Sequence, residues 1–129
     1  MATTELIYSY DKPSNSYIVT GLKSIVNGKV EIPSTYSDGT HGGLSVTSIY
    51  NSAFYNCISL QSVTIPSSIA IIGAYAFAYC PNLESVVIGN GVVDIGERVF
   101  VGCQKLTSIT IPNSVTRIGG YAFNSCTSL

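Results

Sequence analysis

Charged residues are scarce in this 129-residue sequence, and their scarcity excludes one class of partner. Six lysines and arginines are balanced by seven aspartates and glutamates, which gives a formal net charge of −1. The basic side chains are scattered along the chain, so they form no stripe that could neutralise a run of phosphates. We therefore expect no nucleic acid among the partners.

Long apolar runs are also missing. No stretch approaches the ~20 apolar residues that a membrane-spanning helix requires, so we expect no membrane insertion. The first ten residues, MATTELIYSY, lack the basic and apolar regions of a signal peptide. We therefore expect either an intracellular protein or an exported one whose leader lies outside this sequence.

Residues typical of catalytic and metal sites are few. The single histidine, His41, lies in a glycine-rich stretch, and no nucleophile has a register that would bring it close. We interpret Asp94 and Glu97, which lie three residues apart on a short turn, as residues that face water rather than carboxylates that flank a scissile bond. Zinc would need converging ligands at short spacing, and the sequence has no CxxC pair. We therefore expect no enzymatic activity, no catalytic residues, no metal and no cofactor.

What the sequence does contain is one apolar phrase that recurs at a fixed interval. AFYNC at residues 53–57 returns as AFAYC, VFVGC and AFNSC, each 23 residues further on. The register holds without insertion or deletion from Val46 to Leu129. A fixed period of this length is typical of a solenoid, in which each unit buries its apolar face on its neighbours. The recurring positions include Phe54, Phe77, Phe100 and Phe123, and Cys57, Cys80, Cys103 and Cys126.

One unit predicts three pieces of local structure. Residues 106–111 alternate as a short strand with Ile109 and Ile111 pointing inward, and Pro112 ends it because proline has no donor for a ladder. Residues 115–119 predict a second extended piece, and residues 121–126 a helical turn. The sequence therefore predicts an α/β repeat protein, with a parallel β-sheet on one face of the solenoid and short helical turns on the other.

Stacking in register also predicts contacts between neighbouring coils. Tyr75, Arg98 and Tyr121 share one column, which places a guanidinium between two aromatic rings. Asp94 and Arg117 share another and are expected to pair. The four cysteines form a third column in which their Cβ vectors run parallel, so we expect buried, reduced thiols that pack as small hydrophobes.

The N-terminal third departs from the repeat. Residues 6–21 contain two alternating stretches around a DKPSN turn, which predicts a β-hairpin that covers the first coil. Ile32 and Pro33 resemble a repeat strand, but a ten-residue insertion follows, with turn dipeptides that indicate an exposed loop. We therefore assign residues 1–45 to an N-terminal cap and 46–129 to the repeats. The array looks cut within its last unit, so we expect a fragment of a longer protein, or self-association through an uncapped C-terminal end.

The unit L-x-x-I-x-I-P-x-x-V-x-x-I-G-x-x-A-F-x-x-C-x-x-L at residues 106–129 resembles the leucine-rich repeat of the BspA-like family. Departures are Gly89 in place of the proline, Tyr50 in place of the glycine and Val99 in place of the alanine. The resemblance implies a curved leucine-rich repeat solenoid of a surface or secreted protein, used for adhesion to proteins of a host or a neighbouring cell. It implies no enzymatic activity, and the family has no fixed binding motif to carry over.

The first functional hypothesis is therefore a protein-binding module that uses its exposed strand positions. An alternative interpretation is that small hydroxyls on these positions only keep a parallel sheet soluble. A rival hypothesis is a structural spacer that holds another domain away from the cell and has no ligand of its own. The candidate contact residues are Gln61, Ser62, Thr64, Glu84, Ser85, Val87, Thr107, Ser108 and Thr110.

Overall fold

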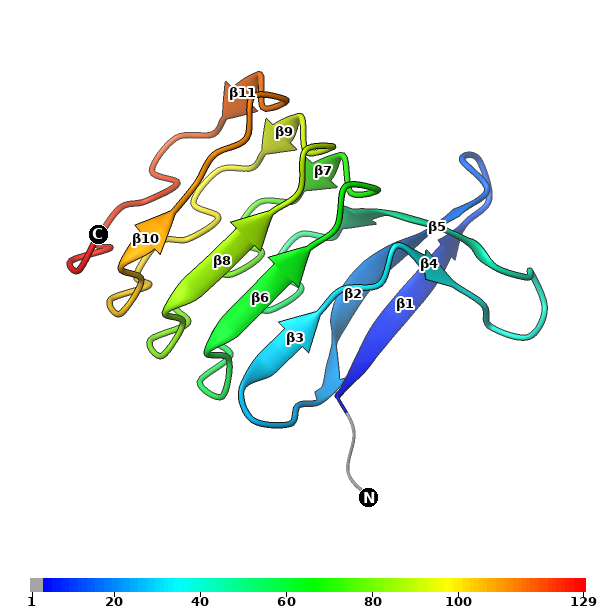
Figure 1. The fold of residues 1–129 in the computed structure, drawn as a ribbon, viewed down its shortest axis with the longest axis horizontal. Coiled ribbons are helices and arrows are strands. Elements are labelled where there is room, and N and C mark those ends of the chain that lie inside the picture. The colour runs from blue at the N-terminus through cyan, green and yellow to red at the C-terminus, as the bar shows by residue number, and fades with distance from the viewer. Residues whose placement is uncertain (1–3) are drawn as a thin grey trace.

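The computed structural model describes residues 4–129 as a stack of coils built from short strands and tight turns (Figure 1). Each repeat coil contributes one strand to each of two sheets and then a turn that leads to the next coil. The strands are β1 (Glu5–Asp11), β2 (Ser16–Ser24), β3 (Lys29–Glu31), β4 (Thr35–Tyr36), β5 (Leu44–Ile49), β6 (Ser62–Ile65), β7 (Ile71–Ile72), β8 (Ser85–Ile88), β9 (Asp94–Ile95), β10 (Ser108–Ile109) and β11 (Arg117–Ile118).

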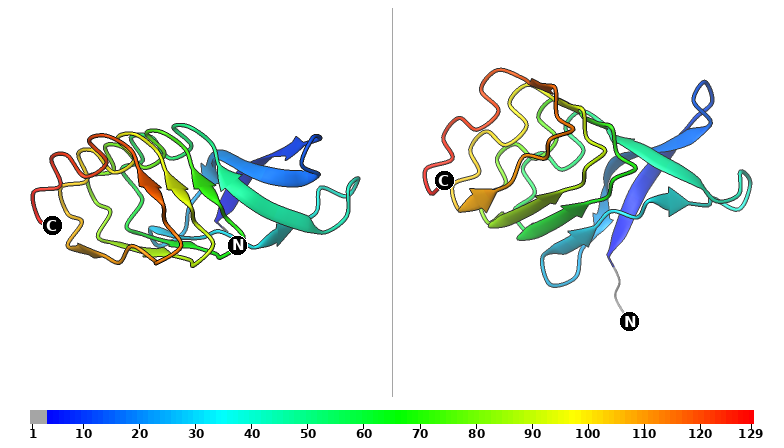
Figure 2. Two further views of the ribbon diagram at one scale, coloured as in Figure 1. Left: turned by 90° about the horizontal axis from the view of Figure 1, so that it is seen from above. Right: turned by 45° about the horizontal axis from the view of Figure 1, so that its top comes forward.

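Two sheets run along the stack (Figure 2). The seven-stranded sheet has the order β1-β2-β5-β7-β9-β11, with β4 paired to β5, and the four-stranded sheet has the order β10-β8-β6-β3. Pairing between successive repeat coils is parallel, and Ser62 lies opposite Ser85 as Ile71 lies opposite Asp94. The 23-residue interval of the sequence is thus the step from one coil to the next.

The core between the sheets is a set of apolar columns. In one coil Leu60, Val63, Ile65, Ile69 and Ile72 are all at most 1 % exposed. The phenylalanine rings stack along the axis with centroids 5.0 Å, 5.5 Å and 5.6 Å apart, in the order Phe54, Phe77, Phe100 and Phe123. The predicted phenylalanine column is therefore confirmed.

The expected helical turns are wrong, because residues 4–129 contain no helix. In the turn of one coil, Tyr75 and Tyr79 have φ of 59° and 55°, which no right-handed helix accommodates. Alternate N–H groups donate to the next coil instead of to the same turn: Phe77 N–H bonds the Val99 carbonyl at 3.0 Å. Backbone bonding between coils thus replaces the i→i−4 bonds that a helix needs.

Close approach of successive coils also explains the repeated glycine. A Cβ on Gly96 would lie 2.6 Å from Ala74 N, and one on Gly119 would lie 2.4 Å from Glu97 N. Tyr50 holds the same position in the first coil, where the preceding element is β2, and its N–H donates to the Val19 carbonyl at 2.8 Å. The departure from glycine at residue 50 therefore falls where no repeat coil precedes.

The predicted hairpin is present at the N-terminal end. Strands β1 and β2 pair antiparallel, and β2 pairs parallel with β5. The hairpin thereby extends the seven-stranded sheet beyond the first coil. Residues 37–43 are exposed, as expected for the inserted loop, but Thr35–Tyr36 forms β4 against β5, which the sequence did not predict.

Candidate functional site

The candidate contact residues lie together on the outer face of the four-stranded sheet. Strands β6 and β8 bury Val63 and Val86, so their alternate positions point to solvent. Ser62 is opposite Ser85, Ser85 is opposite Ser108, and Thr64 is opposite Val87. Every candidate is exposed except Ser62, which is half-buried. We call this surface the strand face; its residues are Gln61, Ser62, Thr64, Glu84, Ser85, Val87, Thr107, Ser108 and Thr110.

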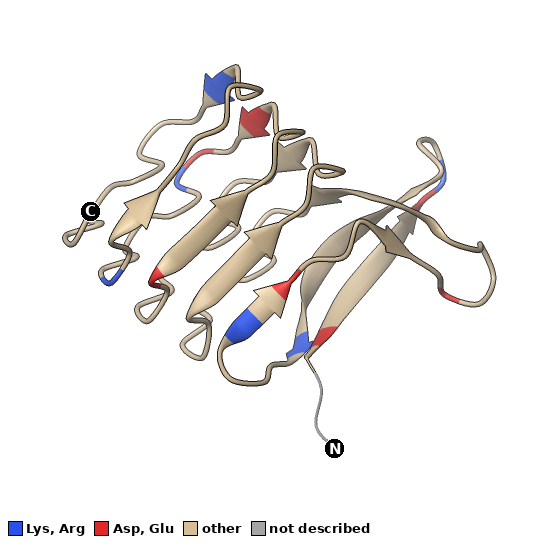
Figure 3. Ribbon diagram, viewed as in Figure 1, with Lys and Arg blue, Asp and Glu red and all other residues tan. Residues whose placement is uncertain are grey.

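The strand face is nearly uncharged and carries one exposed apolar side chain. Glu84 is its single acidic residue, and no basic residue stands among its candidates (Figure 3). Val87 is 59 % exposed, surrounded in its column by threonines. The surface therefore offers hydroxyl donors and acceptors around a small apolar centre.

Two residues of β3 belong to the same columns and were missed from the sequence. Lys29 is opposite Ser62 and Glu31 is opposite Thr64. Their side chains form an ion pair at 3.0 Å. They were missed because the inserted loop breaks the 23-residue interval before residue 46. Comparison of KVEIP at residues 29–33 with SVTIP at residues 62–66 would have found them.

A second exposed surface lies over the turns. The Arg98 guanidinium carbon is 5.9 Å from the Tyr75 ring centroid and 4.9 Å from the Tyr121 ring centroid, which confirms the predicted column. Arg98 Nη1 also donates to the Tyr75 hydroxyl at 2.9 Å.

On the seven-stranded sheet, Arg117 Nη1 pairs with Asp94 Oδ1 at 2.9 Å, as expected. These contacts join neighbouring coils along the surface.

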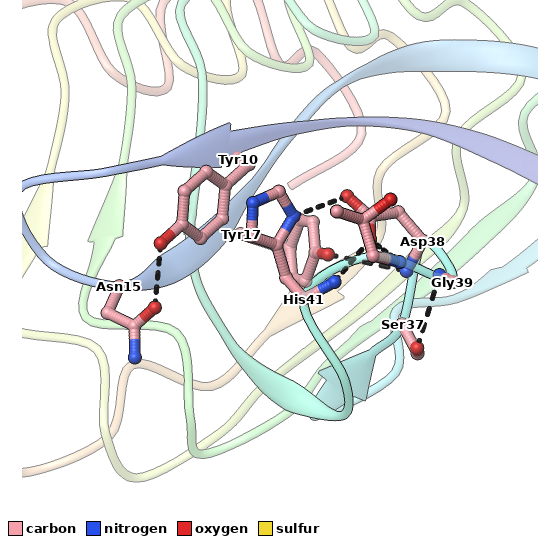
Figure 4. Close-up of polar contacts among 8 residues, drawn as sticks. Tyr10, Asn15, Tyr17, Ser37, Asp38, Gly39 and His41 are labelled. Atoms are coloured by element: carbon pink, nitrogen blue, oxygen red, sulfur yellow. Dashed lines mark hydrogen bonds and ion pairs between the residues drawn. The ribbon is translucent and has the colours of Figure 1, made fainter.

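The single histidine fastens the inserted loop to the hairpin (Figure 4). Its ring stacks on Tyr10 with centroids 3.7 Å apart, and its Nδ1 lies 2.7 Å from Asp38 Oδ2. Asp38 Oδ1 also accepts from the backbone N–H groups of Thr40 and His41 at 2.7 Å and 2.8 Å. The hydrogen bonds from His41 hold the pKa of the Asp38 carboxyl below its ordinary value. This arrangement orders a loop, and it places the carboxylate and imidazole against each other.

The cysteine column is reduced and has a role that the sequence did not reveal. All four thiols are free. Cys80 Sγ donates to the Phe54 carbonyl and Cys103 Sγ to the Phe77 carbonyl, both at 3.1 Å. Burial raises the pKa of Cys80 to about 12 and that of Cys103 to about 11. The thiols therefore act as hydrogen-bond donors between coils as well as small apolar groups. Cys57 and Cys126 at the two ends are only half-buried, so the expectation of full burial fails there.

Among residues 4–129, no group of three or more histidine, cysteine, aspartate or glutamate side chains is placed to hold a metal ion. Over the same residues, no helix has the length and apolar character to cross a membrane.

Solved structures of similar fold come from bacteria. A leucine-rich cell surface protein from Faecalibacterium prausnitzii A2-165 has a TM-score of 0.81 and 28 % identity, over 98 % of this chain and 35 % of its own. A leucine-rich repeat protein from Bacteroides ovatus has a TM-score of 0.80 and 32 % identity, over 100 % of this chain and 39 % of its own. The T. pallidum leucine-rich repeat protein has a TM-score of 0.71 and 30 % identity, over 96 % of this chain and 66 % of its own.

The chain thus spans 35 % to 66 % of the length of these three structures. No curated protein matches it. The family described as the BspA type leucine rich repeat region matches residues 43–129, in six copies, which is about two thirds of the sequence. This match covers the columns and the strand face described above. The chain belongs to the BspA-type leucine-rich repeat family.

Proposed function

We propose that the chain is a non-enzymatic binding module of a surface or secreted protein, which contacts a protein ligand through the strand face. The observation that carries the proposal is the register of this face. Three successive coils present exposed side chains in aligned columns on a rigid parallel sheet, with Ser85 and Val87 at the centre. Rigid elements of this kind hold contact residues in place at little entropic cost on binding.

The location at the cell surface is supported by one of the similar structures. The Faecalibacterium prausnitzii protein, 28 % identical over 98 % of this chain, is named a cell surface protein. The strand face carries a single charged candidate, Glu84, and the depletion of charge is typical of the centre of a protein interface. Both points favour a role in protein recognition or adhesion.

Substitution at the centre of the strand face tests the proposal. Replacing Ser85 and Val87 with arginine puts two bulky charges at the middle of the columns without touching the core. We expect binding to purified extracellular-matrix proteins and to intact neighbouring cells to fall at least tenfold, which corresponds to about 1.4 kcal/mol. Surface plasmon resonance and cell pull-down measure the two kinds of binding.

The matched control lies on the other sheet. Ile71 is 50 % exposed on β7 and Ile118 is 45 % exposed on β11, so the double variant Ile71→Arg with Ile118→Arg adds the same two charges to the seven-stranded sheet. We expect this variant to bind as the unmodified chain does. Equal binding by the Ser85/Val87 variant and the control would contradict the proposal and favour a structural spacer.

A further inference from the structure

The two sheets do not end together at the N-terminal end of the stack. The seven-stranded sheet continues from β5 through β2 to β1, whereas the four-stranded sheet stops at β3. Strand β3 pairs with β6 on one side, and within residues 4–129 no strand of that sheet pairs with its other side. Strand β1 therefore lies next to a position where the four-stranded sheet has no strand (Figures 1 and 2).

At that position, between β1 and β3, lies a groove of about 520 Å³. Its volume is within the range of 300–1,000 Å³ that is typical of ligand sites. The side chains from β1 that line it are Leu6 and Tyr8, which alternate along the strand and point toward the core side. The Tyr8 ring is fixed by stacking on Tyr36 with centroids 3.7 Å apart. One wall of the groove is thus apolar and rigid.

The opposite wall is a strand edge that is open at Glu31. Lys29 is already bonded, because its N–H donates to the Val26 carbonyl at 3.2 Å and its carbonyl accepts from the Thr4 hydroxyl at 3.3 Å. Ile32 N–H donates to the Thr64 carbonyl at 3.0 Å, so the backbone of Ile32 faces β6. Because backbone groups alternate along a strand, the N–H and carbonyl of Glu31 face the groove. Neither group has a hydrogen-bond partner in residues 4–129. An edge of this kind is a template for pairing with another extended chain.

Two opposite charges stand at the same edge. Lys29 and Glu31 are two residues apart on β3 and point to the same face, so they are about 6.6 Å apart along the strand. Val30 between them is buried and points the other way. A strand added beside β3 would alternate in the same manner, with charged side chains beside Lys29 and Glu31 and an apolar one toward Leu6 and Tyr8.

We propose that the groove between β1 and β3 binds an extended segment of the protein ligand, which adds to β3 as a further strand of the four-stranded sheet and runs parallel to it, as the strands of this sheet do. The segment places an acidic side chain beside Lys29, a basic one beside Glu31 and an apolar one between them. This inference rests on the proposed function, because the groove adjoins the strand face and would hold the same partner.

An exchange of the two charges is the sharpest test. The double variant Lys29→Glu with Glu31→Lys keeps the net charge and the ion pair but reverses the order of charges along β3. The probe is a phage-displayed library of random linear peptides, selected separately on the unmodified chain and on the exchange variant. We expect the unmodified chain to enrich peptides with the acidic–apolar–basic pattern and the variant to enrich the reversed order. A peptide from the first selection should bind the variant at least tenfold more weakly.

The hydrogen bonds of the edge are tested separately. Glu31→Pro removes the N–H that faces the groove and spares the groups that bond β6, and proline is tolerated at a strand edge. It is compared with Glu31→Ala, which loses the same carboxylate but keeps the N–H. We expect selected peptides to lose at least tenfold in affinity while the circular dichroism spectrum stays unchanged. If this variant does not fold, the selected peptide is changed instead. N-methylation of every second peptide residue removes N–H groups that could bond β3. Affinity should fall when the methylated residues are those whose N–H groups face β3, and it should hold when they are the residues in between.

The outcomes separate this inference from the proposed function. The Ser85/Val87 arginine variant should still bind the selected peptides, because its changes lie on β8. The inference is overturned if the charge exchange leaves peptide binding unaltered. It is also overturned if the selection on the unmodified chain enriches no peptides above a selection without the protein. Concentration-dependent dimerisation that the exchange abolishes, without peptide binding, also overturns it and assigns the groove to a second copy. If the strand-face variant loses its protein ligand and the groove variants retain it, the proposed function stands and the inference fails.

Discussion

At the residue scale, the molecule depends on side chains that act across coils. The cysteine thiol of one coil donates to the phenylalanine carbonyl of the coil before it, as Cys80 does to Phe54 and Cys126 does to Phe100. A buried carbonyl without a donor would cost about 1–3 kcal/mol, and the Cys80 thiol supplies the donor for Phe54, whereas the Phe100 carbonyl also accepts from the Cys103 N–H at 3.2 Å. The sequence predicted reduced cysteines in a column, but the donor role depends on backbone positions that no residue pattern shows.

Thiol reactivity should follow position in the column. Burial raises the pKa of Cys80 to about 12, which leaves almost no thiolate at pH 8. Cys57 and Cys126 are half-buried at the ends. We expect iodoacetamide to modify these two first in the folded protein, and all four at similar rates in guanidinium chloride. Peptide mass spectrometry over time measures the order. Native Cys80 reacting as fast as Cys57 would contradict it.

The inserted loop should loosen in acid. Because the pKa of Asp38 is lowered in the folded state, its carboxylate stabilises the fold fully above the ordinary value of 3.8. That contribution is lost as the pH falls below this value and through the lowered pKa. We expect the melting temperatures of the unmodified chain and Asp38→Asn to differ at pH 5 and to converge as the pH falls toward about 2. A difference that is independent of pH between these limits would show that the carboxylate has no such role.

At the element scale, the turns decide the architecture. Two residues with positive φ in each turn, such as Tyr75 and Tyr79, aim alternate N–H groups at the next coil. Residues 73–80 are rich in alanine and contain neither β-branched residues nor an interior glycine, which is why the sequence favoured a helix. Bonding between coils overrides that local preference. The strands, in contrast, were predictable because apolar alternation, as at Val63 and Ile65 of β6, reports burial directly.

The glycine that follows the second strand of a repeat coil, as Gly96 follows β9, should resist substitution. A Cβ on Gly96 would lie 2.6 Å from the backbone nitrogen of Ala74, and backbone cannot move aside as a side chain can. We expect Gly96→Ala to lower the free energy of unfolding by about 1–3 kcal/mol, as overpacking does elsewhere. Gly120→Ala is the matched control, because a Cβ there meets nothing within 4 Å. Urea unfolding compares the two, and equal stability of both variants would refute the steric explanation.

At the scale of the whole molecule, stability is shared between neighbouring coils. Each phenylalanine in the middle of the stack contacts a ring on both sides, whereas Phe123 contacts only Phe100. The repeat, its period, the hairpin and the residues of the strand face all followed from the sequence, because each is encoded by periodic apolar positions. Three features could not be predicted in this way: the second sheet as a continuous structure, strand β4 and the groove beside Lys29. They depend on how non-repeating segments pair.

The energetic cost of removing a ring should therefore vary along the stack. We expect Phe77→Ala to lower the free energy of unfolding by about 3–5 kcal/mol, the usual range for a buried phenylalanine. Phe123→Ala should cost less, because its ring is half-buried and packs on one neighbour. Phe77→Leu, which keeps most of the volume, controls for general damage to the core. Denaturant titration of the three variants gives the values, and equal losses at residues 77 and 123 would rule out unequal sharing.

The constant register has a consequence for how such a chain changes in length. Neighbouring coils are joined by backbone groups, which every residue type except proline provides in full, and by side chains that recur every 23 residues. A duplication of one whole unit of coding sequence would leave each column intact and lengthen the stack by one coil. A gain or loss of a single codon within a strand would shift that coil against its neighbours, whereas the inserted loop at residues 37–43 shows that a segment outside the strands can take extra residues while the columns stay aligned. Growth by whole units is thus the tolerated route, and the outward side chains can diverge afterwards while the scaffold is preserved.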